Sequence, residues 1–402
     1  MMSVADATRA VIARVPRLPT EQVALTAAAG RVLAADIVAA RALPGFDNSA
    51  MDGYAARAAE LPATLPVIGV SAAGQVDVAP LAPGSAMRIF TGAPLPVGAD
   101  TVVIQEDAAR DGDRVRLPAA AAGDHTRVVG EDVAIGETVL RAGARLGAWD
   151  LGLLAALGVT AVPVARAPRV ALIATGDELV DVTQPPGAGQ LVDSSVHALA
   201  ALVREVGGTA DRLGIARDTL VSLADHLAAA AGYDVVITTG GVSVGDRDYV
   251  HAAYTAAGIS LELYKIAMKP GKPFSFGLRP GARPGDPAAP IFGLPGNPVS
   301  TLVAYELFLR PALLAMQGAT ELARPIVDVR LVGGYAKQAG RAHYLRARAV
   351  RHGDAIVATP HPKQGSAMLS SLVGCNALVV VAAELTRLAD GAIAPAILLD
   401  AV

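Results

Sequence analysis

The pattern of apolar and polar positions is most regular between Arg169 and Gln317. Short runs rich in β-branched residues alternate there with stretches that have apolar residues at helical spacing, which is typical of βαβ units. The pattern predicts strands at 169–175, 234–239 and 259–264 and helices at 194–206, 218–231 and 297–314. Asp218 is expected to cap the second of these helices. We therefore expect a parallel sheet covered by helices.

Outside this region the pattern is less regular. Helices are predicted near residues 3–13 and 20–29, and the apolar stretch 151–165 is interpreted as a buried helix and strand because glycine and proline interrupt it. The proline- and glycine-rich segment 279–290 predicts a dispensable solvent loop between two strands. From Pro325 onward, valine-rich alternation predicts a small all-β domain.

Composition narrows the classes of protein. With 402 residues, 52% of them hydrophobic and 18% charged, the chain is expected to form several globular domains rather than a disordered or disulfide-stapled structure. A net charge of −3 gives no signature of nucleic-acid binding. Cys375 is the only cysteine, and the first residues lack the apolar core of a signal peptide. We expect a cytoplasmic protein without membrane attachment.

Glycine turns and acidic residues follow two of the predicted strands, in Thr175-Gly-Asp-Glu178 and in Thr239-Gly-Gly-Val-Ser-Val-Gly-Asp-Arg-Asp248. Ligands of such sheets bind beyond the carboxyl ends of strands, and glycines let backbone N–H groups approach an anion closely. We expect Asp248 to hold magnesium against phosphate oxygens. Glu178 is either a second ligand or an acid in the first turn of a helix, and Asp246 is equally well interpreted as a helix cap.

Three lysines occur within eight residues, in Lys265-Ile-Ala-Met-Lys-Pro-Gly-Lys-Pro273. A lysine run is commonly a solvated surface. Here the prolines exclude a regular helix, so Lys265, Lys269 and Lys272 are expected to project from a rigid turn at the edge of the sheet. Fixed positive charge of this kind suits an oxyanion, such as phosphate or a metal oxyanion.

A competing interpretation is a serine hydrolase. Gly241-Val-Ser-Val-Gly245 matches the pattern of a nucleophile elbow around Ser243. The possible bases are His251, His343 and His361. An elbow follows a strand directly, whereas two residues intervene here, and so short a pattern often matches by chance.

Polar residues also cluster in the first half, in Pro44-Gly-Phe-Asp-Asn-Ser-Ala-Met-Asp-Gly-Tyr54. Asp47 is expected to bond the local backbone in an Asx turn, whereas Asp52, before a glycine, is freer to face a site. Two further dense motifs are Arg88-Ile-Phe-Thr-Gly-Ala-Pro94 and Gly293-Leu-Pro-Gly-Asn-Pro298.

This ordered set of motifs resembles the molybdopterin molybdenumtransferase (MoeA) family, to which the E domain of gephyrin is related, along nearly the whole chain. The resemblance implies a multidomain fold of α/β and β parts. They are a split N-terminal helical and β domain (1–38 and 133–166), an inserted β domain (39–132), a three-layer α/β molybdopterin-binding domain (167–318) and a C-terminal β barrel (319–402). Family members are typically homodimers with a site shared between the α/β domain of one subunit and the inserted domain of the other.

The resemblance also implies an activity, in which molybdate is inserted into adenylylated molybdopterin and AMP is released with the assistance of Mg²⁺. The implied catalytic residues are Asp52, Thr91, Glu178, Asp218, Asp248, Lys265 and Lys269. The implied substrate-binding residues are Ser243, Lys272, Pro273, Arg346 and Ser366, and the implied metal ligands are Asp248 and Glu178. Lys269, Lys272, Arg346 and Ser366 would hold the molybdate oxygens.

The chain departs from the family pattern at Phe90 and Ser195, and neither change removes a charged group. The serine at 195 is expected to weaken a pterin contact or a helix cap. The resemblance also implies transient contact with the molybdopterin adenylyltransferase that supplies the substrate. A non-catalytic molybdopterin-binding scaffold, the role that gephyrin gives this module, stays open as an alternative because a fold does not fix a function.

Overall fold

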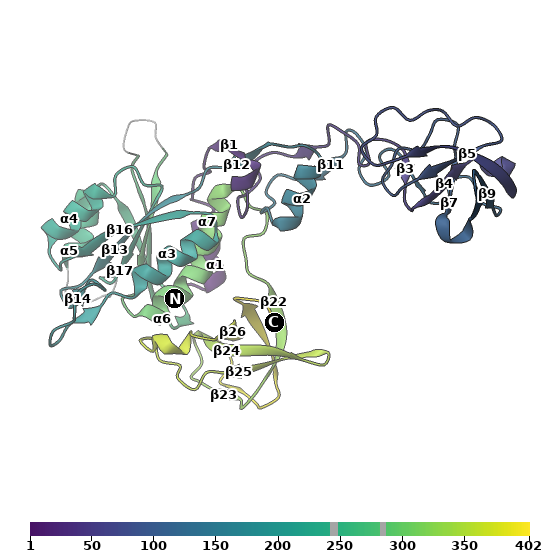
Figure 1. Cartoon of the computed structure of the whole chain (residues 1–402). Helices are drawn as coiled ribbons and strands as arrows, with labels where there is room; N and C mark the ends of the chain where they lie inside the picture. Colours follow the sequence, from purple (N-terminus) through teal and green to yellow (C-terminus); the bar gives the residue numbers. More distant parts are fainter. Residues whose placement is uncertain (242–247, 282–286) are drawn as a thin grey trace. The chain divides into compact units, whose positions relative to one another are not determined.

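The computed structural model describes residues 1–241, 248–281 and 287–402, which form two compact units (Figure 1). The first unit consists of Met1–Ala35, Ala142–Gly147 and Val162–Val402. The second consists of Asp36–Arg141 and Ala148–Ala161. Each unit has a hydrophobic core of its own. The finer division of the chain into four parts stays a prediction.

A six-stranded sheet forms the centre of an α/β domain in the first unit. In spatial order its strands are β16 (Thr209–Ala216), β13 (Arg169–Thr175), β17 (Val235–Thr239), β21 (Ala289–Leu294), β20 (Pro273–Arg279) and β18 (Ser260–Lys265). The first four are parallel, as predicted, but β20 and β18 run antiparallel to their neighbours. Their connections are shorter than the dozen or so residues that a parallel crossover requires.

Helices cover both faces of this sheet, which gives three layers (Figure 1). One face packs against α1 (Val4–Ile12), α3 (Ser195–Glu205), α6 (Pro298–Ala304) and α7 (Arg310–Gln317). The other face packs against α4 (Leu220–Ala229) and α5 (Asp248–Ala256). Leu172 and Ile173, neighbours in β13, belong to the two different cores because successive side chains of a strand point to opposite faces.

The predicted helix after Gly296 is confirmed and is longer than expected. Asn297 is its N-cap and Pro298 opens its first turn. It continues through a π-helical turn, Tyr305–Leu309, to the end of α7. The whole stretch Pro298–Gln317 is long and apolar enough to cross a membrane. However, 78% of its 18-residue apolar segment is buried inside the protein. It is therefore the central core helix of the α/β domain.

The cap predicted for α4 is wrong by one residue. Thr219, not Asp218, is the N-cap, and its side chain accepts a hydrogen bond from the backbone N of Ser222. Asp218 stands outside the helix, on the loop that follows β16. Because threonine provides the cap, the Asp218 carboxylate is not needed for it.

The helix predicted at residues 20–29 does not form. The segment contains β1 (Thr20–Ala24), which pairs with β12 (Ala161–Ala165), and a short 3₁₀ turn, Leu25–Ala27. Burial alternates along β1 with the period of a strand. Pairing with a distant segment has overridden the local helical pattern.

The apolar stretch 151–165 forms the predicted helix and strand, but the prediction that the helix is buried is wrong. It belongs to α2 (Ala148–Ala156), in which only Leu154 is buried. Trp149, at the start of α2, is 92% exposed.

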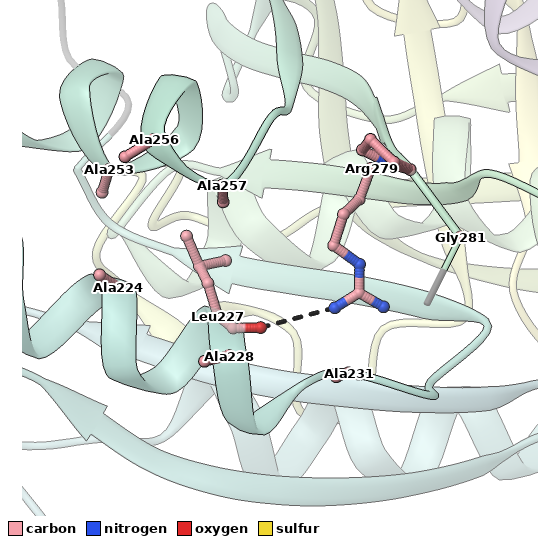
Figure 2. A pocket seen from close by; sticks show the side chains of 10 residues that line it. Ala224, Leu227, Ala228, Ala231, Ala253, Ala256, Ala257, Arg279 and Gly281 are labelled. Atoms are coloured by element: carbon pink, nitrogen blue, oxygen red, sulfur yellow. Dashed lines mark hydrogen bonds between the residues drawn. The ribbon is translucent and has the colours of Figure 1, made fainter. Parts of the chain in front are cut away.

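Arg279 does not belong to a dispensable loop, because it is the last residue of β20. Its guanidinium donates long hydrogen bonds to the carbonyl oxygens of Leu227 (3.5 Å) and Tyr233 (3.4 Å). Arg279 lines a hollow of about 440 Å³ together with alanine residues of α4 and α5. Figure 2 shows Arg279 with Ala224, Ala228 and Ala253 around this hollow. Burial lowers the pKa of this guanidinium. Residues 282–286 of the predicted loop lie outside the described chain.

The C-terminal part is a β barrel, as expected. In spatial order its strands are β19 (Met268–Lys269), β24 (Ala342–His352), β25 (Ala355–Pro360), β22 (Ile326–Leu331), β28 (Ile393–Leu398) and β26 (Ala377–Val381). An additional pairing of β24 with β26 closes the barrel. Val329, Leu345 and Val379 fill its interior. Two further short strands, β23 (Tyr335–Ala336) and β27 (Arg387–Leu388), pair with each other. In the sequence, β23 lies between β22 and β24, and β27 lies between β26 and β28.

The second unit is built on another six-stranded sheet. In spatial order its strands are β7 (Thr101–Ile104), β4 (Gly53–Ala56), β6 (Ala86–Ile89), β5 (Ala63–Ser71), β9 (Arg114–Leu117) and β8 (Ala109–Asp111). Two small pairs are β3 (Asn48–Ser49) with β10 (Thr126–Arg127), and β2 (Ile37–Val38) with β11 (Thr138–Leu140). The motif around Asp52 therefore leads directly into β4 of this sheet.

A buried ion pair provides a test of how the first unit is held together. The Arg324 guanidinium donates to both carboxylate oxygens of Glu306 (2.7 and 3.0 Å) and to the Leu399 carbonyl (2.6 Å). The Glu306 side chain is only 8% exposed. We expect Arg324→Ala to lower the free energy of unfolding by about 3 kcal/mol, because it leaves a buried carboxylate without its partner. Urea denaturation followed by circular dichroism measures this change.

Arg9→Ala is the matched control, since the Arg9–Asp6 pair has side chains 76% and 57% exposed. We expect it to change the free energy of unfolding by less than about 0.5 kcal/mol. Equal effects of the two substitutions would contradict a structural role for the Arg324–Glu306 pair.

Candidate active site

Three parallel strands of the α/β sheet end close together. The Thr175 hydroxyl at the end of β13 donates to the carbonyl of Thr239 in β17 (3.0 Å). The backbone N of Gly240 donates to the carbonyl of Leu294, the last residue of β21 (3.0 Å). Gly240 has a φ of +90°, and a Cβ there would lie 2.5 Å from the Thr175 carbonyl oxygen. Only glycine allows the strand ends to approach this closely.

A cleft of about 850 Å³ opens at this edge of the sheet. The polar side chains in its wall include those of Glu178, Asp193, Ser195, Asp218 and Asn297. Pro273, the last residue of the lysine segment, and Ala367 from the barrel also line it. The cleft lies where open α/β sheets bind ligands, beyond the carboxyl ends of the strands.

Two predicted site carboxylates belong to neighbouring loops of this cleft. The carboxylate of Asp177 accepts a hydrogen bond from the backbone N of Asp218 (3.1 Å), which ties the two loops together. Gly176 has a φ of +149°, and a Cβ there would lie 2.6 Å from the carboxylate of Glu178. The glycine therefore makes room for Glu178, and the structure brings Glu178 and Asp218 to one cleft.

Asp193, which the sequence motifs did not single out, is 6% exposed and lines the same cleft. Its carboxylate accepts hydrogen bonds from the backbone N of Ser195 (3.1 Å) and Val196 (3.4 Å) at the start of α3. Burial raises the pKa of this carboxyl group. Asp193 provides a helix cap that does not depend on the side chain at position 195. An acidic residue just before the predicted helix start was the available signal.

The lysine segment 265–273, called the lysine turn below, connects β18 to β20 beside the cleft and carries the short strand β19. The backbone N of Ile266 donates to the carbonyl of Lys272 (2.9 Å), which closes the turn. Gly271, with a φ of +100°, lies against the first turn of α6, and a Cβ there would be 3.5 Å from the Ser300 carbonyl oxygen. The side chains of all three lysines are exposed. Their ammonium groups are thus available to an anion.

Arg346 lies on β24, and its side chain points to the face opposite Leu345 and is covered by the loop 363–371, so the residue is 1% exposed. Its guanidinium donates to the Ser371 hydroxyl and to the carbonyls of Lys363 and Gly365, each at 3.1 Å. Burial lowers the pKa of this group. Across the described ranges, no carboxylate forms an ion pair with Arg346. A buried positive charge is thus met by neutral oxygen atoms, in the loop that carries Ser366.

Ser366 joins this barrel loop to the cleft. The side-chain amide of Asn297 donates to the Ser366 hydroxyl oxygen (3.2 Å), and the backbone N of Val299 donates to the Ser366 carbonyl (3.1 Å). From the sequence, Asn297 was predicted only to start a helix. The missed signal was its place in the motif Gly293–Pro298, directly after a strand.

Asp52 and Thr91, in the second unit, form a local pair. The backbone N and the hydroxyl of Thr91 both donate to the same Asp52 oxygen, each at 2.7 Å. These bonds, and then the charge of Arg88, hold the pKa of Asp52 below its usual value. Gly53 is pressed against β7, since a Cβ there would lie 2.1 Å from the Val103 carbonyl oxygen. The glycine therefore sets the position of the neighbouring Asp52.

The side chains of three predicted residues, Ser243, Asp246 and Asp248, lie outside the described part of the structure. Ser243, the centre of the hydrolase interpretation, lies outside the described residues, as does Asp246. The backbone of Asp248 begins α5. Over the ranges that are described, no three His, Cys, Asp or Glu side chains form a group that could hold a metal ion.

His343 lies next to the lysine turn, because β24 pairs with β19 at His343 and Lys269. The imidazole is 6% exposed, and its Nδ1 is hydrogen-bonded to the Tyr335 hydroxyl (3.0 Å). Burial, followed by the positive charges of Lys269, Lys337 and Arg341, lowers its pKa to about 4. His343 is therefore neutral near pH 7.

The fold and the cleft define a class of protein, namely an α/β ligand-binding domain whose cleft is bordered by a loop of a β barrel. Three family models cover most of the chain. They are the MoeA N-terminal region (domain I and II) at residues 2–158, a probable molybdopterin binding domain at 171–315, and the MoeA C-terminal region (domain IV) at 328–399.

Individual relatives agree. The chain is 40% identical to the molybdopterin molybdenumtransferase of Nostoc sp. over 345 residues, which cover 82% of this chain and 78% of the relative. It is 37% identical to molybdopterin molybdenumtransferase 2 of Mycobacterium tuberculosis over 386 residues, 92% of each chain. The crystal structure of the molybdopterin biosynthesis moeA protein from Pyrococcus horikoshii OT3 matches with a TM-score of 0.84 at 30% identity, covering 99% of this chain and 100% of that one. The chain belongs to the MoeA family.

The Asp52–Thr91 pair gives a direct test of local electrostatics. We expect Thr91→Val to raise the pKa of Asp52, because it removes the hydroxyl bond to the carboxylate. The pKa should stay below that of an unperturbed aspartate, since the larger effect comes from the backbone N of residue 91. Carbon-13 NMR titration of labelled aspartates measures both values. Thr126→Val is the control, because the Thr126 hydroxyl donates to the Gly123 carbonyl. An unchanged Asp52 pKa in Thr91→Val would refute this account.

The neutral His343 predicts a pH dependence of stability. An exposed imidazole in the unfolded chain binds a proton near pH 6.5, whereas the folded pKa is about 4. Between these values the unfolded state binds more protons, so this contribution to stability is complete above about pH 6.5 and is lost as the pH falls towards 4. We expect His343→Gln to show a shallower fall of unfolding free energy with decreasing pH than wild type. Urea titrations from pH 4.5 to 7 measure it, and the exposed His352→Gln should retain the wild-type slope.

Proposed function

We propose that this protein inserts molybdate into adenylylated molybdopterin and releases AMP. As a member of the MoeA family it is a transferase of molybdenum cofactor biosynthesis, and the Nostoc and Mycobacterium relatives are molybdopterin molybdenumtransferases. The observation that carries the chemical part of the proposal is the buried charge of Arg346, which no carboxylate pairs within the described residues. A buried cation is costly without a counter-charge, and an anion bound at the loop of Ser366 would provide one.

In this proposal the oxyanion is held by hydrogen bonds and positive charge from two segments. Lys269 and Lys272 on the exposed turn, with Ser366 and Arg346 from the barrel, hold molybdate oxygens. Pro273 shapes the wall of the cleft, and Lys265 stabilises the charge that develops as the bond to the adenylyl group breaks. Ser243 contributes to substrate binding.

We further propose that Mg²⁺ is held by Asp248 and Glu178. The donor chemistry fits, because the Glu178 carboxylate lines the cleft and carboxylate oxygens are the ligands that Mg²⁺ prefers. Asp218 supplies a second carboxylate in the same wall. Bound magnesium would offset negative charge on the phosphate oxygens of the substrate.

The remaining parts of the proposal concern assembly and location. Asp52 and Thr91 belong to a different compact unit from the cleft. We propose a homodimer in which the Asp52–Thr91 pair of one subunit completes the cleft of the other. The protein would work in the cytoplasm, without nucleic acid or membrane, and would make transient contact with the adenylyltransferase that supplies its substrate.

The central experiment is AMP release from adenylylated molybdopterin, with and without molybdate and magnesium. We expect wild-type release to depend on both additions. Lys269→Ala should lower kcat/KM by about 10²- to 10³-fold because it removes a charged group that stabilises the transition state. Asp248→Asn should abolish the response to magnesium.

Matched controls come from the exposed hairpin turn of the barrel. Arg351→Ala and Asp354→Asn remove the same kinds of charge from exposed positions and should leave the rate unchanged. A wild-type protein that binds the pterin substrate but releases no AMP would overturn the enzymatic proposal in favour of a binding or scaffold role.

A further inference from the structure

Asn297 holds the N-cap position of α6, yet its side chain makes no capping hydrogen bond. Asparagine is among the strongest capping residues because its side-chain oxygen normally accepts a bond from the second or third backbone N–H of the helix. Here the amide Nδ2 donates instead to the hydroxyl oxygen of Ser366, 3.2 Å away in the barrel loop. The usual local interaction has been replaced by one with a residue 69 positions distant.

Ser366 takes over the cap that Asn297 has given up. The backbone N of Val299, the second residue of α6, donates to the Ser366 carbonyl at 3.1 Å. The two segments therefore exchange roles, since the barrel residue satisfies the helix and the helix residue holds the barrel hydroxyl. Loss of the Asn297 side chain should cost the helix little, because its capping acceptor is elsewhere.

The exchange leaves the Ser366 hydroxyl in a defined state. A serine hydroxyl can accept and donate at the same time, and its oxygen already accepts from Asn297. Within the part of the chain that the structure describes, no hydrogen bond donated by this hydroxyl is found. Its proton is thus available to an acceptor outside the protein, and both Asn297 and Ala367 line the cleft beside it.

The barrel loop is also held from within. Arg346 donates to the carbonyls of Lys363 and Gly365, and the side chain of Gln364 donates to the Arg346 carbonyl at 2.9 Å. The buried Arg346 side chain therefore restrains the backbone just before Ser366. The Ser366 hydroxyl could still rotate about its Cβ–Oγ bond, and the hydrogen bond from Asn297 restricts that rotation.

We infer that Asn297 is a positioning residue for the oxyanion, which directs the proton of the Ser366 hydroxyl towards molybdate in the cleft. The inference rests on the proposed function. It assigns Asn297 no contact with molybdate, since the residue acts through the hydroxyl that it holds. A pre-oriented donor binds an anion better than a free rotor because less freedom is lost on binding.

The test is a double-mutant cycle of Asn297→Ala and Ser366→Ala. We expect Ser366→Ala to raise the dissociation constant of molybdate about tenfold, as loss of one hydrogen bond to a charged group does. Asn297→Ala should raise it by up to about tenfold, because the freed hydroxyl must then lose its rotational freedom on binding. The double variant should be no worse than Ser366→Ala alone, because Asn297 acts only through Ser366. Equilibrium dialysis with molybdate, quantified by mass spectrometry, measures binding without turnover.

Steady-state AMP release supplies a second readout. In Asn297→Ala the KM for molybdate should rise by up to about tenfold, whereas kcat and the KM for adenylylated molybdopterin should change less than about twofold. Ser370→Ala removes an exposed hydroxyl nearby in the same loop region and should match wild type in both assays. Thermal denaturation should give Asn297→Ala and wild type the same midpoint.

The outcomes separate the two claims. Additive losses in the double variant, equal loss of affinity for both substrates in Asn297→Ala, or wild-type protein that binds no molybdate would each overturn the inference. If wild type binds molybdate but releases no AMP, the proposed function falls, and the dialysis constants alone then decide the role of Asn297.

Discussion

The candidate active site depends on the packing of other segments against the first turn of α6. Three segments that are distant in sequence reach this turn or the residues just before it, at van der Waals distance or by hydrogen bonds. A Cβ on Gly296 would lie 3.5 Å from Gly240 at the strand ends, Gly271 of the lysine turn approaches the Ser300 carbonyl, and the barrel loop is bonded through Ser366. The approach that requires glycine is at Gly240, where a Cβ would lie 2.5 Å from the Thr175 carbonyl oxygen. Strand ends, lysine turn and barrel loop therefore meet around the start of α6, beside the cleft.

Two buried arginines in the first unit differ in whether the protein itself balances their charge. The difference indicates a structural role for one and a binding role for the other. Arg324 is paired with both oxygens of Glu306, so its charge is balanced within the protein. Arg346 is more deeply buried, but its guanidinium meets only hydroxyl and carbonyl oxygens among the described residues. The first arrangement holds helix and barrel together. The second keeps a positive potential in a loop beside the cleft, which is the arrangement expected where an anion is bound.

Sequence patterns predicted the elements that depend on local or short-range order. The strand and helix periodicities of 169–175, 194–206 and 297–314 are confirmed because each element buries a continuous apolar face. The pattern at 20–29 failed, because pairing of β1 with β12 is non-local. β18, β20 and β21 are joined by short connections, so β20 runs antiparallel to both of its neighbours. The periodicity of apolar residues predicts that a strand forms but not in which direction it runs.

For the candidate site, the sequence by itself determined the chemical groups and the family, since glycine turns, carboxylates and a lysine turn recur in a fixed order of motifs. It could indicate that Glu178 follows a strand end, because a strand and its following loop are neighbours in the chain. Only the tertiary structure decided that Asp193 and Asn297 line the same cleft, and that Arg346 is buried without a carboxylate partner among the described residues. It also decided that Ser366 caps α6 through the backbone N of Val299. These facts arise from packing between elements far apart in sequence, and the distances that define them exist only once the chain has folded.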